Sequence, residues 1–306
     1  MKCLIAVIGP TAVGKTKLAL FLSQKFNGEI INADSRQVYS FMDIGTAKPS
    51  TTDRKLIPHH LIDVVNPDEP FSLALYKDLA IKAIEDIQIR GKFPFLVGGT
   101  GLYIWSIIEG WMIPEVPPNI EFRKQLENIA AKEGTGDLFQ KLKSVDPVAA
   151  AKIMPSNLRR IIRALEIHQS TGTPPSQLWQ KKLPPFSTLI IGLTTHRQTL
   201  YNMIDSRVDE MINNGLVDEI RSLIAMGYSL DLPSMSGIGY RQIGKFLQNE
   251  TSLSEATQQI KNETHKFARR QYTWFHLDDN RIHWFDICGN ILAPINNLVE
   301  NFLKRN

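Results

Sequence analysis

The chain has 306 residues, of which 43% are hydrophobic and 22% charged, as in ordinary soluble globular proteins. This length allows one large domain or two smaller ones. No apolar run approaches the roughly 20 residues of a membrane-spanning helix, and the apolar stretch 3–8 is too short for a signal peptide, so we expect a cytoplasmic protein. The net charge of +4 is too small to indicate a nucleic-acid partner by itself. The two cysteines exclude a disulfide framework and a cysteine-based metal knuckle.

Strands and helices alternate in the first part of the chain. Apolar runs bounded by turn residues predict strands at 2–8, 29–32, 93–97 and 188–193, with a late strand at 281–286. Apolar residues at helical spacing predict helices at 15–26, 72–90, 197–214, 216–226, 240–248, 254–275 and 291–304. This alternation indicates βαβ units, so we predict an α/β fold with a mostly parallel sheet flanked by helices.

Residues 115–185 differ from the rest because they contain no convincing strand. Prolines mark both ends of this segment, and helices are predicted inside it at 121–132 and 157–171. We therefore expect a helical insertion domain at 115–185, between two parts of a phosphate-loop core at 1–114 and 186–306. We expect the insertion to leave the sheet at the carboxyl edge, where open α/β folds bind their ligands.

A phosphate-binding loop follows the first predicted strand. The sequence GPTAVGKT fits the pattern G-x-x-x-x-G-K-[ST] in full, with an apolar strand before it and an amphipathic helix after it. Its residues are Gly9, Pro10, Thr11, Ala12, Val13, Gly14, Lys15 and Thr16. In such a loop, backbone N–H groups surround phosphate oxygens, the lysine adds positive charge and the last hydroxyl can bind Mg²⁺. The sequence therefore predicts a diphosphate or nucleotide site, with Mg²⁺ as cofactor bound through Thr16.

The third predicted strand lacks the carboxylate that often helps to hold magnesium in ATP-hydrolysing proteins. It runs through 95–97 into the sequence GGTG at 98–101, without an acidic residue. This absence argues against a motor protein or a GTPase-like switch. It favours an enzyme that uses the loop to bind a diphosphate.

The second predicted strand ends at a carboxylate, Asp34. There it would face the bound phosphates, where a general base for an incoming nucleophile is expected. Alternatively, Asp34 caps a following helix with Gln37 as its capping-box partner. The glycine loop at 98–101 brings the Thr100 hydroxyl to the same cleft, although a tight strand-to-helix turn would look alike. The histidine pair at 59–60 has no third ligand at a recognised metal-site spacing.

Two segments are rich in positive charge. Residues 152–164 contain four cations and no acid, and Arg159 and Arg163 share one helix face because they are four residues apart, with the isoleucines between them packing behind. Residues 265–276 mix cations with aromatic side chains. Both compositions suit phosphate contacts and base stacking in RNA. An amphipathic helix with a solvated basic face would have the same pattern.

Nine segments together resemble the tRNA dimethylallyltransferase (tRNA isopentenyltransferase) family in its bacterial form. They are GPTAVGKT at 9–16, DSRQVY at 34–39, IGTAKP at 44–49, HHLID at 59–63, VGGTGLY at 97–103, RRIIRALE at 159–166, IDSRVDEM at 204–211, GIGYRQ at 237–242 and ARRQYTWF at 268–275. They occur in family order across nearly the whole chain. The middle of the insertion carries no such motif.

The resemblance implies transfer of a dimethylallyl group from dimethylallyl diphosphate to the exocyclic amine of the adenosine 3′ of the anticodon in tRNA, releasing diphosphate. The implied catalytic residues are Asp34, Thr100 and Arg207, with Asp34 taking the amine proton and Arg207 binding diphosphate. The implied tRNA contacts are Asp34, Ser35, Arg36, Gln37, Thr100, Arg123, Arg159, Arg160, Ile161, Ile162 and Arg163. The expected partners are dimethylallyl diphosphate and the anticodon stem-loop, which the insertion would contact, and we expect a monomer with no membrane association.

Three other functions share parts of this pattern. A small-molecule kinase would have the same phosphate loop and an acid on the neighbouring strand. An adenylate isopentenyltransferase would prenylate a free adenine nucleotide, although the basic insertion favours tRNA. A non-catalytic, nucleotide-responsive RNA-binding module would bind RNA and form no product.

Overall fold

The computed structural model describes residues 2–305 and divides the chain into two compact units. The core unit consists of Met1–Ile108 and Pro184–Asn306, and the insertion unit is Glu109–Leu183. Within residues 2–305, no helix has both the length and the apolar character needed to cross a membrane.

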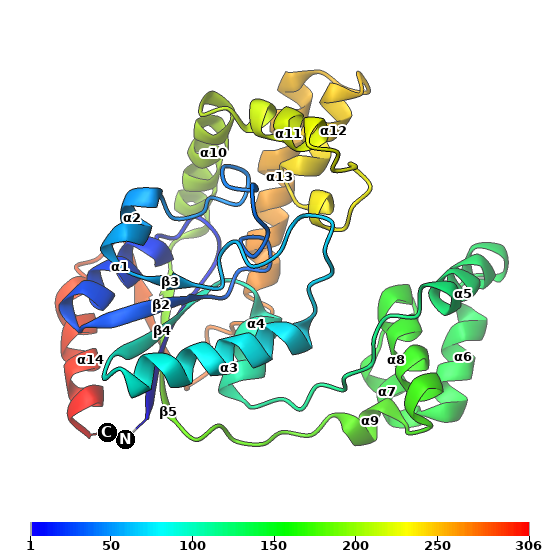
Figure 1. The fold of residues 1–306 in the computed structure, drawn as a ribbon, viewed down its shortest axis with the longest axis horizontal. Coiled ribbons are helices and arrows are strands. Elements are labelled where there is room, and N and C mark those ends of the chain that lie inside the picture. The colour runs from blue at the N-terminus through cyan, green and yellow to red at the C-terminus, as the bar shows by residue number, and fades with distance from the viewer. Residues whose placement is uncertain (1, 306) are drawn as a thin grey trace. The chain divides into compact units, whose positions relative to one another are not determined.

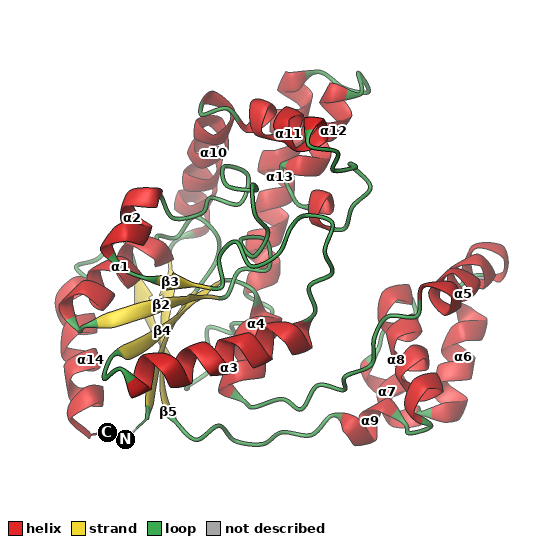
Figure 2. Ribbon diagram, viewed as in Figure 1, coloured by secondary structure: helices red, strands yellow, loops and turns green. Residues whose placement is uncertain are grey.

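The core unit contains a sheet in which every strand pairing is parallel (Figures 1 and 2). Its order across residues 2–305 is β3-β2-β4-β1-β5-β6. The strands are β1 (Cys3–Ile8), β2 (Gly28–Asn32), β3 (His59–His60), β4 (Phe93–Gly98), β5 (Ser187–Thr194) and β6 (Ile282–Asp286). The α/β prediction is confirmed. The sequence did not reveal β3, because two residues are too few to show an alternating pattern.

Helices cover both faces of this sheet, which explains why its central strands are apolar throughout. Side chains alternate between the two faces of a strand, and Ile5 and Val7 join the hydrophobic cluster that contains Leu18 of α1 (Lys15–Lys25) and Ile295 of α14 (Leu292–Arg305). Helix α3 (Leu73–Ile89) packs on the other face against β2 and β4, burying Tyr76, Ala80, Ile84 and Ile87 (Figure 1).

The remaining helices of the core unit adjoin the loops that leave the sheet. They are α2 (Thr51–Leu56), α4 (Gly101–Ile108), α10 (Arg197–Asn213), α11 (Leu216–Ala225), α12 (Tyr240–Leu247) and α13 (Leu253–Gln271), with a short 3₁₀ turn at Ser234–Ser236. Helices α10 to α13 pack against one another as a group (Figure 1). Helix α13 ends at Gln271, four residues before the expected end, because the chain turns there through hydrogen bonds at 272–275.

The insertion unit is entirely helical apart from its connections. Its helices are α5 (Ile120–Glu133), α6 (Gly136–Val145), α7 (Pro147–Lys152), α8 (Leu158–Thr171) and α9 (Pro175–Leu178). They enclose a separate hydrophobic core that includes Leu126, Leu142, Ile161, Ile162 and Leu165. The sequence indicated α5 and α8 but not the shorter α6, α7 and α9.

The strand order places three loops side by side at one edge of the sheet. Strand β4 lies between β2 and β1, with Asn32 paired to Val97 and Ile8 paired to Gly98. The phosphate loop follows β1, the loop with Asp34 follows β2, and the glycine loop follows β4. Parallel pairing therefore brings the predicted catalytic segments together.

Candidate active site

The phosphate loop presents unpaired backbone donors at the start of α1. The N-cap residue of α1 is Gly14, and no side chain caps the helix. The first N–H groups of a helix have no partner within it and carry the positive end of its dipole, so they form an anion site. Lys15 donates from Nζ to the Pro10 carbonyl at 2.7 Å, which holds its ammonium group beside the loop.

Asp34 stands where β2 ends, in a tight turn rather than at a helix start. Its Oδ1 accepts the N–H of Arg36 at 2.8 Å, and its own N–H donates to Asn32 Oδ1 at 3.0 Å. No helix follows Asp34 before α2. The alternative that Asp34 caps a helix with Gln37 is therefore wrong. Within residues 2–305 no hydrogen bond reaches Asp34 Oδ2, so one carboxylate oxygen remains available to a ligand.

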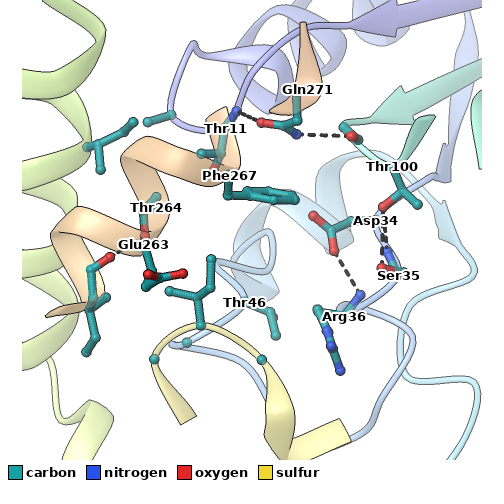
Figure 3. A pocket seen from close by; sticks show the side chains of 18 of the residues that line it. Thr11, Asp34, Ser35, Arg36, Thr46, Thr100, Glu263, Thr264, Phe267 and Gln271 are labelled. Carbon is teal, nitrogen blue, oxygen red and sulfur yellow. Dashed lines mark hydrogen bonds between the residues drawn. The ribbon is translucent and has the colours of Figure 1, made fainter. Parts of the chain in front are cut away.

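The glycine loop after β4 comes close to Asp34 because it carries no side chains where the backbones meet. A Cβ on Gly98 would lie 2.2 Å from the Ala33 carbonyl oxygen, and one on Gly99 would lie 2.1 Å from Gln271 Nε2. Thr100 then accepts the Ser35 N–H at its Oγ1 at 3.1 Å (Figure 3). The same loop forms the turn from β4 into α4. Its glycines therefore serve both as a tight strand-to-helix turn and as the place where the backbone approaches the cleft.

Arg207 reaches the phosphate loop from α10 and adds a second cation to this edge. Its Nη1 donates to Thr11 Oγ1 at 3.2 Å. Burial and, to a smaller extent, the positive charge of Arg207 lower the pKa of Lys15 to about 7, against the opposing attraction of Asp34. Burial also lowers the pKa of Arg207, against the attraction of Asp34. These two cations and Asp34 therefore share one enclosed site.

Two cavities of the core unit meet at this cluster. Their shared walls are Thr11, Ala12, Asp34, Thr46 and Arg207. The loop cavity, of about 490 Å³, contains the phosphate loop with Lys15 and Thr16. The helix cavity, of about 580 Å³, lies against α10 and α13 and has an apolar wall formed by Ile204, Val208, Met211, Ile260 and Phe267. Asp34 thus stands between the cavity of the phosphate loop and a partly apolar one.

Three connections stabilise this site. Arg36 donates to the carbonyls of Pro233 and Ser234 at 2.8 and 3.1 Å, and Gln37 donates to the carbonyls of Thr46 and Ala47 at 3.1 Å. The Glu219 carboxylate accepts the N–H groups of Asp43, Ile44 and Gly45 and the hydroxyl of Tyr240. The side chains of Arg36 and Gln37 therefore hold loops of the cavity wall.

In the insertion unit, two expected RNA-binding arginines hold a buried carboxylate. Glu166, 2% exposed, accepts two hydrogen bonds from Arg123, one from Arg163 and one from the Asn119 N–H, at 2.6–2.8 Å. Burial alone would raise the pKa of Glu166, but these hydrogen bonds outweigh it and lower the pKa. Arg159 and Arg160 are exposed.

Ile161 and Ile162, which are expected among the RNA contacts, have buried side chains. Their side chains are 0% and 4% exposed and belong to the hydrophobic core of the insertion unit. They are buried because they lie on the inner face of α8, opposite Arg159 and Arg160. Their side chains therefore pack beneath Arg159 and Arg160, and an RNA contact of Ile161 or Ile162 stays a prediction.

Comparison with known proteins agrees with this arrangement. The family model described as IPP transferase matches residues 37–278. The chain belongs to the IPP transferase family. It is 53% identical over 272 residues to the tRNA dimethylallyltransferase of Roseiflexus castenholzii, with 89% of each chain covered. It is 47% identical over 300 residues to that of Dehalococcoides mccartyi, covering 98% of this chain and 92% of the relative.

Solved structures of the IPP transferase family have the same fold. The tRNA isopentenylpyrophosphate transferase of Bacillus halodurans is 40% identical, with a TM-score of 0.72, and 99% of this chain and 96% of that chain are covered. A eukaryotic dimethylallyltransferase acting on tRNA is 28% identical, with a TM-score of 0.80. The match covers 98% of this chain and 80% of that chain.

This member of the IPP transferase family has further residues at its site to which the sequence assigned no individual role. Phe267 and Thr264 of α13 line the helix cavity, and Figure 3 shows the Phe267 ring beside Asp34. Gln271 contacts both the phosphate loop and the glycine loop. Phe267 lies in the segment 265–276, where aromatic side chains at helical spacing indicate an inward face, whereas the polar residues Thr264 and Gln271 carry no such signal.

Replacing Glu166 by alanine is expected to destabilise the insertion unit. The change removes the acceptor of the Asn119 N–H and of two arginines, but the arginines are 38% and 36% exposed and can turn to water. We therefore expect a loss of about 1–3 kcal/mol, the range for a lost buried hydrogen-bonding group. Hydrogen exchange of peptides from 109–183 measures it. Unchanged exchange there would contradict a structural role for Glu166.

Proposed function

We propose that this chain transfers a dimethylallyl group from dimethylallyl diphosphate to the exocyclic amine of the adenosine 3′ of the anticodon in tRNA, with release of diphosphate. The observation that supports this proposal most is the meeting of two cavities at Asp34. The loop cavity contains the N–H groups and cations that an anion needs. The helix cavity has both apolar and polar lining residues, and its volume of about 580 Å³ leaves room for a base. Family membership supports the same reaction.

The diphosphate of the donor would lie in the loop cavity. The N–H groups at the start of α1, Lys15 and Arg207 would bind its oxygens, and Thr16 would offer a hydroxyl to Mg²⁺. Residues 2–305 contain no group of three histidine, cysteine or acidic side chains that could hold a metal ion. A site with few protein ligands fits Mg²⁺, which retains waters and binds phosphate oxygens. The ion would add positive charge beside the leaving group.

The reaction forms one bond and breaks another, and each change has a residue beside it. The adenine amine attacks the allylic carbon, the carbon–oxygen bond to diphosphate breaks, and the amine proton passes to Asp34. The amine is a weak nucleophile because its lone pair is delocalised into the ring, so proton removal by an aligned base accelerates attack. Charge growing on the departing diphosphate is stabilised by Lys15, Arg207 and the loop N–H groups.

Thr100 would act beside Asp34 rather than on the diphosphate. Its Oγ1 holds the Ser35 N–H and so fixes the turn that carries Asp34. The target adenosine must leave its stack to reach this cleft, as for other base-modifying enzymes. The tRNA would then be contacted chiefly by the loops of the cavity wall, which are held in place by Ser35, Arg36 and Gln37.

The insertion unit would contact the anticodon arm through its basic face. Arg159 and Arg160 are the exposed cations of α8, and Arg123 and Arg163 would contribute through their exposed edges. We propose a cytoplasmic enzyme, because tRNA is its substrate. The monomeric state stays a prediction, which light scattering of the purified protein checks.

Replacing Arg159 and Arg160 together by alanine is expected to weaken tRNA binding and to lower the salt dependence of binding by about 1–2 in log–log slope, because each phosphate contact releases counterions. Binding isotherms at several salt concentrations measure both quantities. The matched control, Lys141→Ala with Lys143→Ala, removes the same charge from exposed positions of α6. Equal losses in both double variants would assign the effect to net charge rather than to this face.

One assay tests the proposed activity against its rivals. The protein is incubated with unmodified tRNA, Mg²⁺ and dimethylallyl diphosphate, and the tRNA mass is measured. Addition of one prenyl unit to the tRNA is expected. Prenylation of free adenosine monophosphate instead would indicate an adenylate isopentenyltransferase, ATP consumption with a small acceptor would indicate a kinase, and RNA binding without product would indicate a non-catalytic module.

A further inference from the structure

Gln271 is a buried polar residue that joins two loops of the active site. It is the last residue of α13 and is 3% exposed. Its Oε1 accepts the N–H of Thr11 at 2.7 Å, and its Nε2 donates to the Gly99 carbonyl at 3.0 Å (Figure 3). One side-chain amide thus uses both its acceptor and its donor between the phosphate loop and the glycine loop.

Each of these contacts leads directly to a reacting group. Thr11 accepts the hydrogen bond of Arg207, and Gly99 immediately precedes Thr100, whose hydroxyl holds the turn of Asp34. The path runs from Arg207 through Gln271 to the Asp34 turn in four hydrogen bonds. Both ends of the proposed reaction, the diphosphate grip and the proton acceptor, therefore depend on the position of this amide.

Gln271 packs directly against the glycine loop. A Cβ on Gly99 would lie 2.1 Å from Nε2, so the glycine loop is in direct contact with the amide. The sequence separation is large, since Thr11 and Gln271 are 260 positions apart. Helix α13 therefore acts as a brace that fixes how far the β1 loop stands from the β4 loop.

We propose that Gln271 is a positioning residue that sets the separation between the diphosphate site and Asp34, an inference that rests on the proposed function of these two groups. Misplacing reacting groups by about 1 Å costs on the order of 10²-fold in rate. Both polar ends of the Gln271 amide are committed to protein loops, so the side chain has no free group for the reaction itself. Its contribution is to kcat, through the relative placement of two loops.

The chemistry of the amide gives a test that separates positioning from simple packing. In Gln271→Glu, an ionised carboxylate still accepts the Thr11 N–H but turns a second acceptor toward the Gly99 carbonyl. A protonated carboxyl group has one O–H, and it can donate to that carbonyl. The variant therefore regains the native pattern when it is protonated.

The experiment compares kcat and KM for prenyl transfer between pH 6 and 8.5. At pH 8 we expect kcat of Gln271→Glu to fall by about 10²-fold, and the ratio to wild type to recover as pH falls. Gln271→Met, which lacks both hydrogen bonds, should lose a similar factor at every pH. The control Gln259→Glu, at an exposed position of the same helix, should follow wild type.

Taking each variant as a ratio to wild type cancels the titrations that the proteins share, and Gln271→Met, which adds no charge, is the reference for the groups around this position. These groups are Lys15 of the phosphate loop, Asp34 after β2, Arg207 of α10 and Arg270 and Tyr272 beside Gln271. They are the same in all four proteins.

Three results are decisive. A ratio for Gln271→Glu that does not change with pH, or a wild-type kcat in Gln271→Met, would overturn the inference. If Gln271→Glu does not fold, as thermal unfolding would show, Gln271→Met decides alone. Absence of prenylated tRNA from the wild-type protein would instead refute the proposed function, which keeps the two failures distinct.

Discussion

Replacing Asp34 by asparagine is expected to reduce kcat for prenyl transfer by about 10²–10⁴-fold, the usual contribution of an aligned general base. Asparagine keeps an oxygen that can accept the Arg36 N–H, so the turn should persist, but its amide cannot take the proton of the adenine amine. Single-turnover formation of prenylated tRNA measures the rate. Binding of tRNA should stay close to wild type, because the change is confined to one side chain.

The control for this variant is Asp68→Asn, the same change at an exposed position of the core unit. It should leave both binding and turnover unchanged. A near-normal rate in Asp34→Asn would remove Asp34 from the chemistry. A variant that bound tRNA weakly in proportion to its loss of rate would show that Asp34 recognises the substrate and does not activate it.

Replacing Lys15 by methionine is expected to lower kcat by about 10²–10³-fold, the cost of losing one donor to a developing anion. It should also change the pH dependence of diphosphate binding. Because the pKa of Lys15 is lowered to about 7, the free protein holds this side chain largely neutral at pH 8. A bound diphosphate favours the charged form, so binding at pH 8 should take up close to one proton.

The direction of the Lys15 pKa shift sets the pH range in which diphosphate affinity changes. Affinity contributed by Lys15 is fully present below pH 7 and weakens as pH rises, since each binding event must then draw a proton from solution. Calorimetry in two buffers with different ionisation enthalpies counts the protons taken up. Lys25→Met, at an exposed position of the same helix that does not line the loop cavity, should take up as many as wild type. Equal proton uptake by Lys15→Met would mean that another group accounts for it.

The sequence predicted the parts of the site that follow strands, because local patterns define them. The phosphate loop has a complete motif, and Asp34 and Thr100 come at the ends of recognisable apolar runs. Parallel pairing then places those ends at one edge without further information. The strand order confirmed this, with β4 between β1 and β2.

The residues that hold the site together were not predictable in the same way. Gln271 meets Thr11 across 260 positions, and Arg36 meets Pro233 across 197. Neither partner carries a local signal for the other, since the contact exists only when α13 and the loops are packed. The positions of such residues follow from tertiary structure, and one sequence does not encode them as a pattern.

The basic segment of α8 shows a different limit. Four cations without an acid between 152 and 164 indicated an RNA-binding face, but Glu166 lies just beyond this window and pairs with Arg163. Arg123 joins the same carboxylate from α5. Charge counted along the chain therefore overstated the number of uncommitted cations by including Arg163, whereas Lys152, Arg159 and Arg160 are exposed.

The most direct measurement is a crystal structure of the protein with an unmodified anticodon stem-loop and a dimethylallyl diphosphate analogue in which sulfur replaces the bridging oxygen. We expect the diphosphate on the phosphate loop, the flipped adenine in the adjoining cavity, and the exocyclic nitrogen within about 3 Å of the Asp34 carboxylate. A base bound on the far side of the phosphate loop, with its amine out of reach of Asp34, would contradict the account.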